Sequence, residues 1–288
     1  MTPTAPRPRR SALYMPGGNG RALEKAKTLA ADVVILDLED SVAPDGKAEA
    51  RALACAAVAA GGFGPREVVV RVNGLDMPWG AADLAAAAAA GPDAILLPKV
   101  SVPADIEAAR AGAGRARLWA MIETCQAIFR LDDLGAASRE HGVDVWVIGA
   151  NDLVKEMRCR PGAERAPLLP ALALSVMAAR AHGLVILDGV YNAIPDLDGL
   201  AAECAQGSAF GFDGKSLIHP SHLEIANAAF TPAAEEVAWA RTVAAAYAAP
   251  ENAGAGVIKV EGRMVERLHL AQAERLIAVA DAIAARAG

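Results

Sequence analysis

The chain has 288 residues, a formal net charge of −6, and 54% hydrophobic but only 4% aromatic residues. This length fits one α/β barrel of about 250 residues with an appendage, although two domains are also compatible with it. The acidic balance argues against non-specific nucleic-acid binding, and no apolar run reaches the ~20 residues that cross a bilayer. Residues 1–10 lack the apolar stretch of a secretory signal, and the four cysteines have no paired spacing. We therefore expect a globular, cytoplasmic protein without a disulfide scaffold or a zinc site.

Eight short apolar runs, bounded by turn residues, predict eight β-strands with gaps long enough for helices. The runs alternate little, which is typical of parallel strands covered on both faces. In chain order they span residues 12–15, 33–38, 68–72, 94–97, 118–122, 143–148, 184–187 and 209–212. Eight βα units predict a TIM (β/α)8 barrel. A doubly wound open sheet is the alternative, but its usual glycine fingerprint after the first strand is absent.

The pattern changes after the eighth strand. The expected elements are a helix over 231–248, two strands over 257–260 and 263–265 joined by a turn at Glu261-Gly262, and a helix over 268–285. This helix-hairpin-helix extension has too little core to form an independent domain. We therefore predict a catalytic barrel over residues 1–230 and a lid over residues 231–288 that packs on the barrel or on a neighbouring subunit.

Seven of the eight runs lead into charged or amide side chains. Loop solvation explains one such case, but seven in series favour an active site, because strand ends of a barrel converge on one rim. These side chains are Asp37, Glu39 and Asp40; Arg71 and Asn73; Lys99; Glu123; Asn151 and Asp152; Asp188; and Asp213 and Lys215.

Glu123 and Asp152 are one βα unit apart, so they should lie side by side on this rim. Two carboxylates with no accompanying histidine favour Mg²⁺, or Mn²⁺, over zinc or non-haem iron. The alternative is an acidic pair that forms salt bridges with Arg71 or Lys215, and the sequence favours neither interpretation.

Arg71 stands inside the apolar run Val70-Arg71-Val72, where an unpaired guanidinium would be costly. It needs an acidic partner, such as Asp37 or Glu39, or an anionic ligand. Its planar fork suits a substrate carboxylate, and the two interpretations are compatible.

The segment Pro16–Gly20 follows the first strand and offers backbone N–H groups to an anion. A cationic cluster that could hold phosphates surrounds it, although a solvated tail and helix face explain its outer members equally well. The cluster comprises Arg7, Arg9, Arg10, Arg21, Lys25 and Lys27, against Glu24 alone.

Several motifs together resemble the HpcH/HpaI aldolase and citrate lyase β-subunit family, from about Arg10 to the C-terminal helix. Within it, the sequence is most similar to the malyl-CoA and citramalyl-CoA lyase group. The motifs are RSALYMPG at 10–17, DLEDSV at 37–42, RVNG at 71–74, LPKV at 97–100, IET at 122–124, GANDL at 149–153 and GFDGKSLIHP at 211–220.

The resemblance implies a trimeric or hexameric TIM barrel whose Glu123 and Asp152 hold Mg²⁺. Arg71 would bind the carboxylate or carbonyl oxygen of a small keto acid, and Asp37 and Glu39 are assigned to the same catalytic group. The acyl-CoA would lie near the first βα turn. Its expected contacts are Arg10, Tyr14, Arg21 and Lys25.

The resemblance also implies that the C-terminal hairpin is a lid over a neighbouring subunit's site. CoA-using relatives commonly carry Asp-Gly-Lys-Met in the lid turn, with Asp as the acid/base. Here the turn reads Glu261-Gly262-Arg263-Met264, so the carboxyl is one methylene further out. A displacement of ~1 Å can matter greatly to catalysis.

The expected activity is Mg²⁺-dependent, reversible C–C cleavage of a 3-hydroxyacyl-CoA such as malyl-CoA, β-methylmalyl-CoA or citramalyl-CoA. The products would be glyoxylate or pyruvate and an acyl-CoA. The alternatives are a malyl-CoA thioesterase and a citrate lyase β subunit that acts on citryl thioesters within a complex. A non-catalytic binding module is disfavoured, because it has little reason to keep Arg71, Glu123 and Asp152 together.

Overall fold

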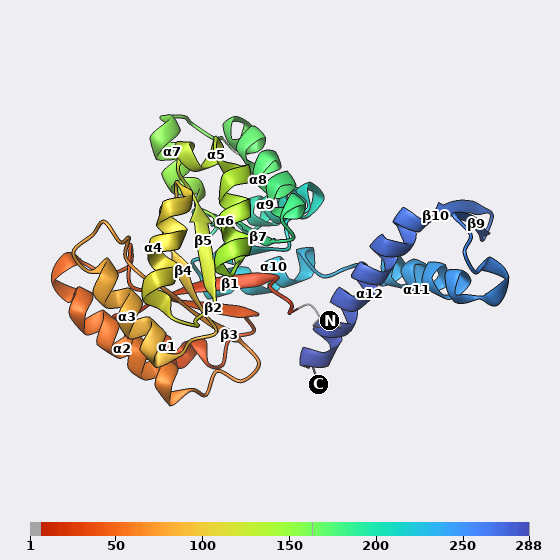
Figure 1. Cartoon of the computed structure of the whole chain (residues 1–288). Helices are drawn as coiled ribbons and strands as arrows, with labels where there is room; N and C mark the ends of the chain where they lie inside the picture. The colour runs from red at the N-terminus through yellow and green to blue at the C-terminus, as the bar shows by residue number, and fades with distance from the viewer. Residues whose placement is uncertain (1–6, 163, 288) are drawn as a thin grey trace. The chain divides into compact units, whose positions relative to one another are not determined.

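The structure is a computed structural model that describes residues 7–162 and 164–287 (Figure 1). These residues form two compact units, which we describe separately. The first unit comprises residues 9–230, and the second comprises residues 231–287 with residues 7 and 8. None of the described helices has both the length and the apolar character needed to cross a membrane.

Eight parallel strands form a closed barrel in chain order, and the last strand pairs with the first. The strands are β1 (Ser11–Pro16), β2 (Val33–Asp37), β3 (Glu67–Arg71), β4 (Ala94–Leu97), β5 (Leu118–Ile122), β6 (Val143–Ile148), β7 (Val185–Asp188) and β8 (Gly214–Leu217). The predicted TIM barrel is therefore confirmed, and the closure excludes an open doubly wound sheet.

The predicted eighth strand, residues 209–212, is wrong. Ala209 and Phe210 belong to the last turn of helix α9 (Leu197–Phe210), which ends where Gly211 adopts a left-handed conformation with φ of 93°, and Phe212 lies in the loop that follows. The real strand, β8, contains Lys215 and Ser216, whose polar side chains hide it from a search for apolar runs. Asp213 consequently precedes β8 at the N-terminal end of the barrel, where it forms an ion pair with Arg180. It is therefore not at the C-terminal rim.

Helices cover the outside of the barrel. Side chains of successive strand residues alternate between an interior layer and a larger layer under the helices, and small aliphatic residues dominate both. The helices are α1 (Gly20–Ala26), α2 (Lys47–Ala60), α3 (Gly80–Ala90), α4 (Pro103–Ala113), α5 (Cys125–Ile128), α6 (Leu131–His141), α7 (Ala150–Met157), α8 (Leu169–Ala181), α9 and α10 (Leu223–Ala229).

The second unit contains α11 (Ala234–Ala248), a hairpin of β9 (Val257–Val260) and β10 (Arg263–Glu266), and α12 (Arg267–Ala287). The predicted hairpin is present, with Glu261 and Gly262 both at positive φ, 48° and 84°, as a two-residue type I′ turn requires. A small apolar cluster that includes Val243, Tyr247 and Ile258 packs the two helices against the hairpin.

Candidate active site

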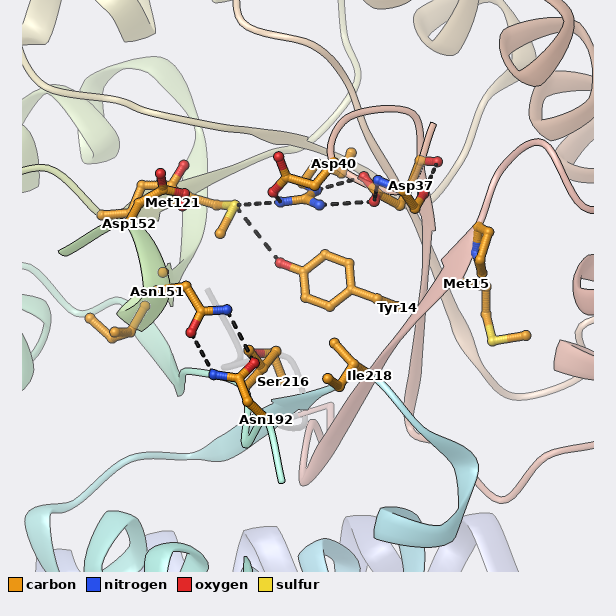
Figure 2. Close-up of a pocket in the computed structure, with 17 residues that line it drawn as sticks. Tyr14, Met15, Asp37, Asp40, Met121, Asn151, Asp152, Asn192, Ser216 and Ile218 are labelled. Atoms are coloured by element: carbon orange, nitrogen blue, oxygen red, sulfur yellow. Dashed lines mark hydrogen bonds and ion pairs between the residues drawn. The ribbon is translucent and has the colours of Figure 1, made fainter. Parts of the chain in front are cut away.

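A cavity of about 330 Å³ opens at the C-terminal ends of the strands (Figure 2). Residues on or just after seven of the eight strands contribute polar or charged side chains to it, so many of the side chains expected at one rim do converge there. The polar and charged lining residues are Tyr14, Asp37, Asp40, Ser41, Arg71, Glu123, Asn151, Asp152, Asn192 and Ser216.

Arg71, at the end of β3, is 6% exposed and is held firmly on one edge. Its Nε and Nη2 donate to Oδ1 and Oδ2 of Asp37 at 2.6 and 2.8 Å. Below the guanidinium lies the ring of Tyr14, with its centroid 4.7 Å from Cζ. Nη1 lies 2.8 Å from Oε2 of Glu39 and donates to Oδ2 of Asp40 at 3.3 Å, and Arg71 lines the cavity. The structure thus brings both predicted acidic partners, and Asp40 with them, to Arg71.

Asp37 orients Arg71. Besides the guanidinium, its carboxylate accepts the backbone N–H groups of Glu39 and Ser41 at 2.9 and 3.0 Å. Burial alone would raise the pKa of Asp37, but the Arg71 charge and these hydrogen bonds lower it below its ordinary value. A carboxylate so fully occupied stays ionised and does not exchange protons with a substrate.

Glu123, directly after β5, is 1% exposed and lines the cavity. Its Oε1 accepts the backbone N–H of Lys99 at 2.7 Å, and its carboxylate packs against Gly149, where a β-carbon would overlap it. Burial raises the pKa of Glu123 to about 7, and the neighbouring charge of Lys99 only partly opposes this. Negative charge on Glu39 and Asp152 raises it further.

Asp152 lies in the first turn of α7, half-buried, and lines the same cavity. It lies 3.8 Å from the Nζ of Lys99, and the same Nζ lies 2.6 Å from Glu39. The proposed salt bridges to Arg71 or Lys215 are not found for Glu123 and Asp152. Lys99 is the cation beside both carboxylates: its Nζ lies near Asp152, and its backbone N–H donates to Glu123. The backbone of Lys99 is left-handed, with a φ of 53°.

These two carboxylates fit a divalent cation. Mg²⁺ commonly uses one or two protein carboxylates and completes its shell with water and substrate oxygens, for which the cavity has room. The raised pKa of buried Glu123 marks a place where positive charge is lacking. Within the described residues, no cluster of three His, Cys, Asp or Glu side chains exists that could hold a metal by itself.

The residues expected to contact CoA do not come together. Arg10 precedes β1 at the opposite end of the barrel, where its Nε lies 2.8 Å from Asp32. Tyr14 lies inside the barrel on the cavity wall, whereas Arg21 and Lys25 are exposed on α1, at the end of the barrel where β1 finishes. The prediction for Arg10 is therefore wrong, because the residue belongs to the barrel's N-terminal closure.

Two further rim predictions fail, since Asp188 and Lys215 point outward beneath the helices. Lys215 is fully buried, with Nζ 2.7 Å from Glu203 and 3.2 Å from Asp188. Arg165 closes the group with Nη1 2.8 Å from Asp188. We call these four residues the closed cluster.

Sequence reasoning gave no role to several lining residues. Met121 points into the cavity from β5, and Asn151 and Asn192 exchange amide hydrogen bonds of 3.2 and 2.7 Å across its mouth (Figure 2). Asn151, in the first turn of α7, was expected only as a strand-end side chain, and neither an apolar strand residue such as Met121 nor a loop amide such as Asn192 carries a signal that separates it from a structural residue. Glu261 lies at the exposed tip of the hairpin in the second unit.

A closed barrel with two acidic residues and an oriented arginine at its C-terminal rim has the arrangement that TIM-barrel enzymes use for their active sites, and its two carboxylates are suited to a divalent cation. The HpcH/HpaI aldolase/citrate lyase family model matches residues 10–220, and the chain belongs to this family.

Three relatives illustrate the family's range. The chain is 50% identical to a (3S)-malyl-CoA thioesterase of Cereibacter sphaeroides (strain ATCC 17029) over 278 residues, 96% of each chain. It is 33% identical to an L-malyl-CoA/β-methylmalyl-CoA lyase of the same species, with 98% of each chain covered. Mycobacterium tuberculosis CitE, solved with magnesium, acetoacetate and coenzyme A, is 31% identical with a TM-score of 0.75, and the match covers 94% of this chain and 97% of that one.

Proposed function

We propose that this protein hydrolyses the thioester of (3S)-malyl-CoA, or of a close 3-hydroxyacyl-CoA, in a Mg²⁺-dependent reaction. The observation that carries the proposal is the single cavity in which Glu123, Asp152 and the oriented Arg71 face one another. The 50% identity to malyl-CoA thioesterases, over nearly the whole chain, favours hydrolysis. The lyase reaction is the second candidate, supported by the same site and by 33% identity to a malyl-CoA lyase.

Glu123 and Asp152 would hold the cation. Bound there, Mg²⁺ supplies Lewis-acid polarisation of substrate oxygens. Arg71, fixed by Asp37, presents Nη1 to the oxygen on which negative charge develops. Glu39 and Lys99 hold each other at 2.6 Å between the arginine and the metal carboxylates, which keeps both charges in place.

In hydrolysis, the oxygen of a water attacks the thioester carbon and the C–S bond breaks. CoA leaves as the thiol once it has gained a proton. We assign the proton from the water to Glu261, delivered by the hairpin of a neighbouring subunit in a trimer or hexamer. In the lyase reaction the same carboxylate would protonate the enolate carbon. Arg21 and Lys25 on α1 are the proposed cationic contacts of CoA.

Product analysis separates the two reactions. The full chain is incubated with Mg²⁺ and malyl-CoA, and products are resolved by mass. Malate with free CoA supports the thioesterase, and glyoxylate with acetyl-CoA supports the lyase. Neither product pair from the wild type, under conditions where the protein is folded, contradicts both candidates.

Mixing two inactive variants tests whether Arg71 and Glu261 of one site come from different subunits. Arg71→Ala and Glu261→Ala chains are each expected to be inactive, and mixing them should recover activity if the two residues come from different subunits. The control is each variant mixed with itself. No recovery in proven mixed oligomers contradicts the intersubunit assignment of Glu261.

A further inference from the structure

Two hydrogen-bond donors in the cavity converge on one sulfur atom. Tyr14 Oη lies 3.8 Å from Sδ of Met121, and Nη1 of Arg71 lies 3.6 Å from the same sulfur. Figure 2 shows both contacts as dashed lines that end on the sulfur of Met121. The three side chains come from β1, β3 and β5 and all line the cavity.

A thioether is a weak acceptor for two such donors. Across the described chain, the Tyr14 hydroxyl has no other hydrogen-bond partner. Burial raises the pKa of Tyr14, and the opposing charge of Arg71 does not cancel this, so the hydroxyl keeps its proton. A buried donor pair aimed at a poor acceptor beside open cavity space is a site for a better acceptor, namely an oxygen that gains negative charge.

Met121 is suited to give way. Its side chain is unbranched with three rotatable bonds, so it can leave its position by rotamer change without moving β5. Arg71 and Tyr14 are not free to follow it. Asp37 fixes one edge of the guanidinium, and the Tyr14 ring lies against the guanidinium, with its centroid 4.7 Å from Cζ of Arg71. The donors are rigid and the occupant between them is flexible.

We propose that Tyr14 Oη and Arg71 Nη1 form a two-donor site for the thioester carbonyl oxygen of the substrate, entered when Met121 moves aside. The proposal rests on the proposed function but holds for both candidate reactions. Water attack moves the C=O π pair onto this oxygen, and C–C cleavage leaves an enolate whose charge lies on the same atom. Tyr14 donates a hydrogen bond and transfers no proton.

Tyr14→Phe isolates the hydroxyl, because the phenyl ring keeps its place beneath Arg71. The expected result is a fall in kcat of about 10²-fold, as for loss of one oxyanion donor, with KM and Mg²⁺ affinity within about twofold. Tyr191→Phe is the matched control. It removes an exposed hydroxyl that bonds Asp196 at 2.6 Å, and its rate is expected to stay at the wild-type value.

The Tyr14 hydroxyl could instead act only by positioning the sulfur of Met121. Combining Tyr14→Phe with Met121→Leu tests this alternative. If Tyr14 only holds Met121, Tyr14→Phe has no further effect once the sulfur is gone. If Tyr14 contacts substrate, the ~10²-fold loss persists in the double variant. Persistence supports the two-donor site, and disappearance of the loss overturns it.

Infrared spectroscopy of bound acetyl-CoA, labelled with ¹³C at the carbonyl, tests the contact without turnover. In the presence of Mg²⁺ the carbonyl stretch should shift to lower frequency on wild-type protein, and less on Tyr14→Phe. Equal shifts on the two proteins overturn the two-donor site while leaving the proposed function standing. A wild type that neither turns over malyl-CoA nor binds acetyl-CoA overturns the proposed function itself, and the two-donor site with it.

Discussion

The barrel contains two groups of buried charges that differ in how completely they are paired. In the closed cluster, two cations, Arg165 and Lys215, meet two carboxylates, Asp188 and Glu203, within 3.3 Å. At the cavity, two cations, Arg71 and Lys99, lie beside five carboxylates. These five are Asp37, Glu39, Asp40, Glu123 and Asp152, and we call the seven residues the open cluster.

The difference distinguishes a structural network from a binding site. Burying charges is tolerable when each has partners, and the closed cluster meets that condition without a ligand. The open cluster has more carboxylates than cations. Burial raises the pKa of Glu123 to about 7, and negative charge on Glu39 and Asp152 contributes to the rise. Ion pairing alone therefore does not mark function, whereas an unbalanced group beside a cavity does.

The largest expected effect comes from removing charge in the open cluster. Glu123→Gln keeps the shape but deletes a metal ligand, so activity should fall by more than about 10²-fold and Mg²⁺ binding should be lost. Stability should stay equal or rise, because a buried carboxylate is gone. Initial rates over a Mg²⁺ titration, with thermal unfolding, measure both. A variant with wild-type rates and Mg²⁺ affinity would show that Glu123 is no ligand.

The closed cluster should respond in stability. Lys215→Met retains the aliphatic stem but leaves Asp188 and Glu203 with fewer cations, at a cost of about 3–5 kcal/mol of unfolding free energy. Lys25→Met, on the exposed face of α1, should change stability by less than about 0.5 kcal/mol. Urea unfolding measures both. Equal stabilities would mean that the closed cluster contributes no more than a surface charge.

A smaller effect is expected where the backbone shapes the open cluster. Gly149→Ala places a β-carbon onto the Glu123 carboxylate, which must shift, so Mg²⁺ affinity should weaken about tenfold, or about 1.4 kcal/mol. Gly20→Ala is the control, because nothing lies within 4 Å of a β-carbon there. Calorimetric Mg²⁺ titration compares the variants. Unchanged affinity in Gly149→Ala would show that the glycine has no part in placing Glu123.

The last expected effect, on stability alone, is a pH dependence. Unfolded Glu has a pKa of about 4.3, whereas folded Glu123 titrates at about 7, so from ~4.3 to ~7 the unfolded chain holds fewer protons. Stability contributed by this group is present below that window and is lost as pH rises through it. With divalent cations removed by a chelator, the difference in unfolding temperature between Glu123→Gln and the wild type should grow as the pH is raised from 5 to 8. A constant difference would contradict the raised pKa.

Most of the fold can be predicted from the sequence because seven strands are largely continuous apolar runs. The eighth was missed because β8 contains Lys215 and Ser216, while the apolar residues before it end α9. Without an apolar run around it, Lys215 could be assigned to a strand only once its buried partners were known. Here these are Asp188 and Glu203, the second of them on a helix.

The open cluster was predicted through residue type and order along the chain, which placed Arg71, Glu123 and Asp152 on one rim. Lys99 was seen as a strand-end residue but gained no role, since its contacts depend on a left-handed backbone. Arg10 was misplaced because it lies one residue before β1, and chain proximity to the first βα turn says nothing about which end of a strand a residue occupies.

Barrel closure also bears on how the protein is made. Ser11, Ala12 and Leu13 of β1 pair with Lys215, Ser216 and Leu217 of β8. The cavity takes Tyr14 from one end of this sequence span and Ser216 from the other. During synthesis the site therefore cannot exist until the eighth strand has left the ribosome, and a nascent chain lacking β8 exposes the edges of β1 and β7.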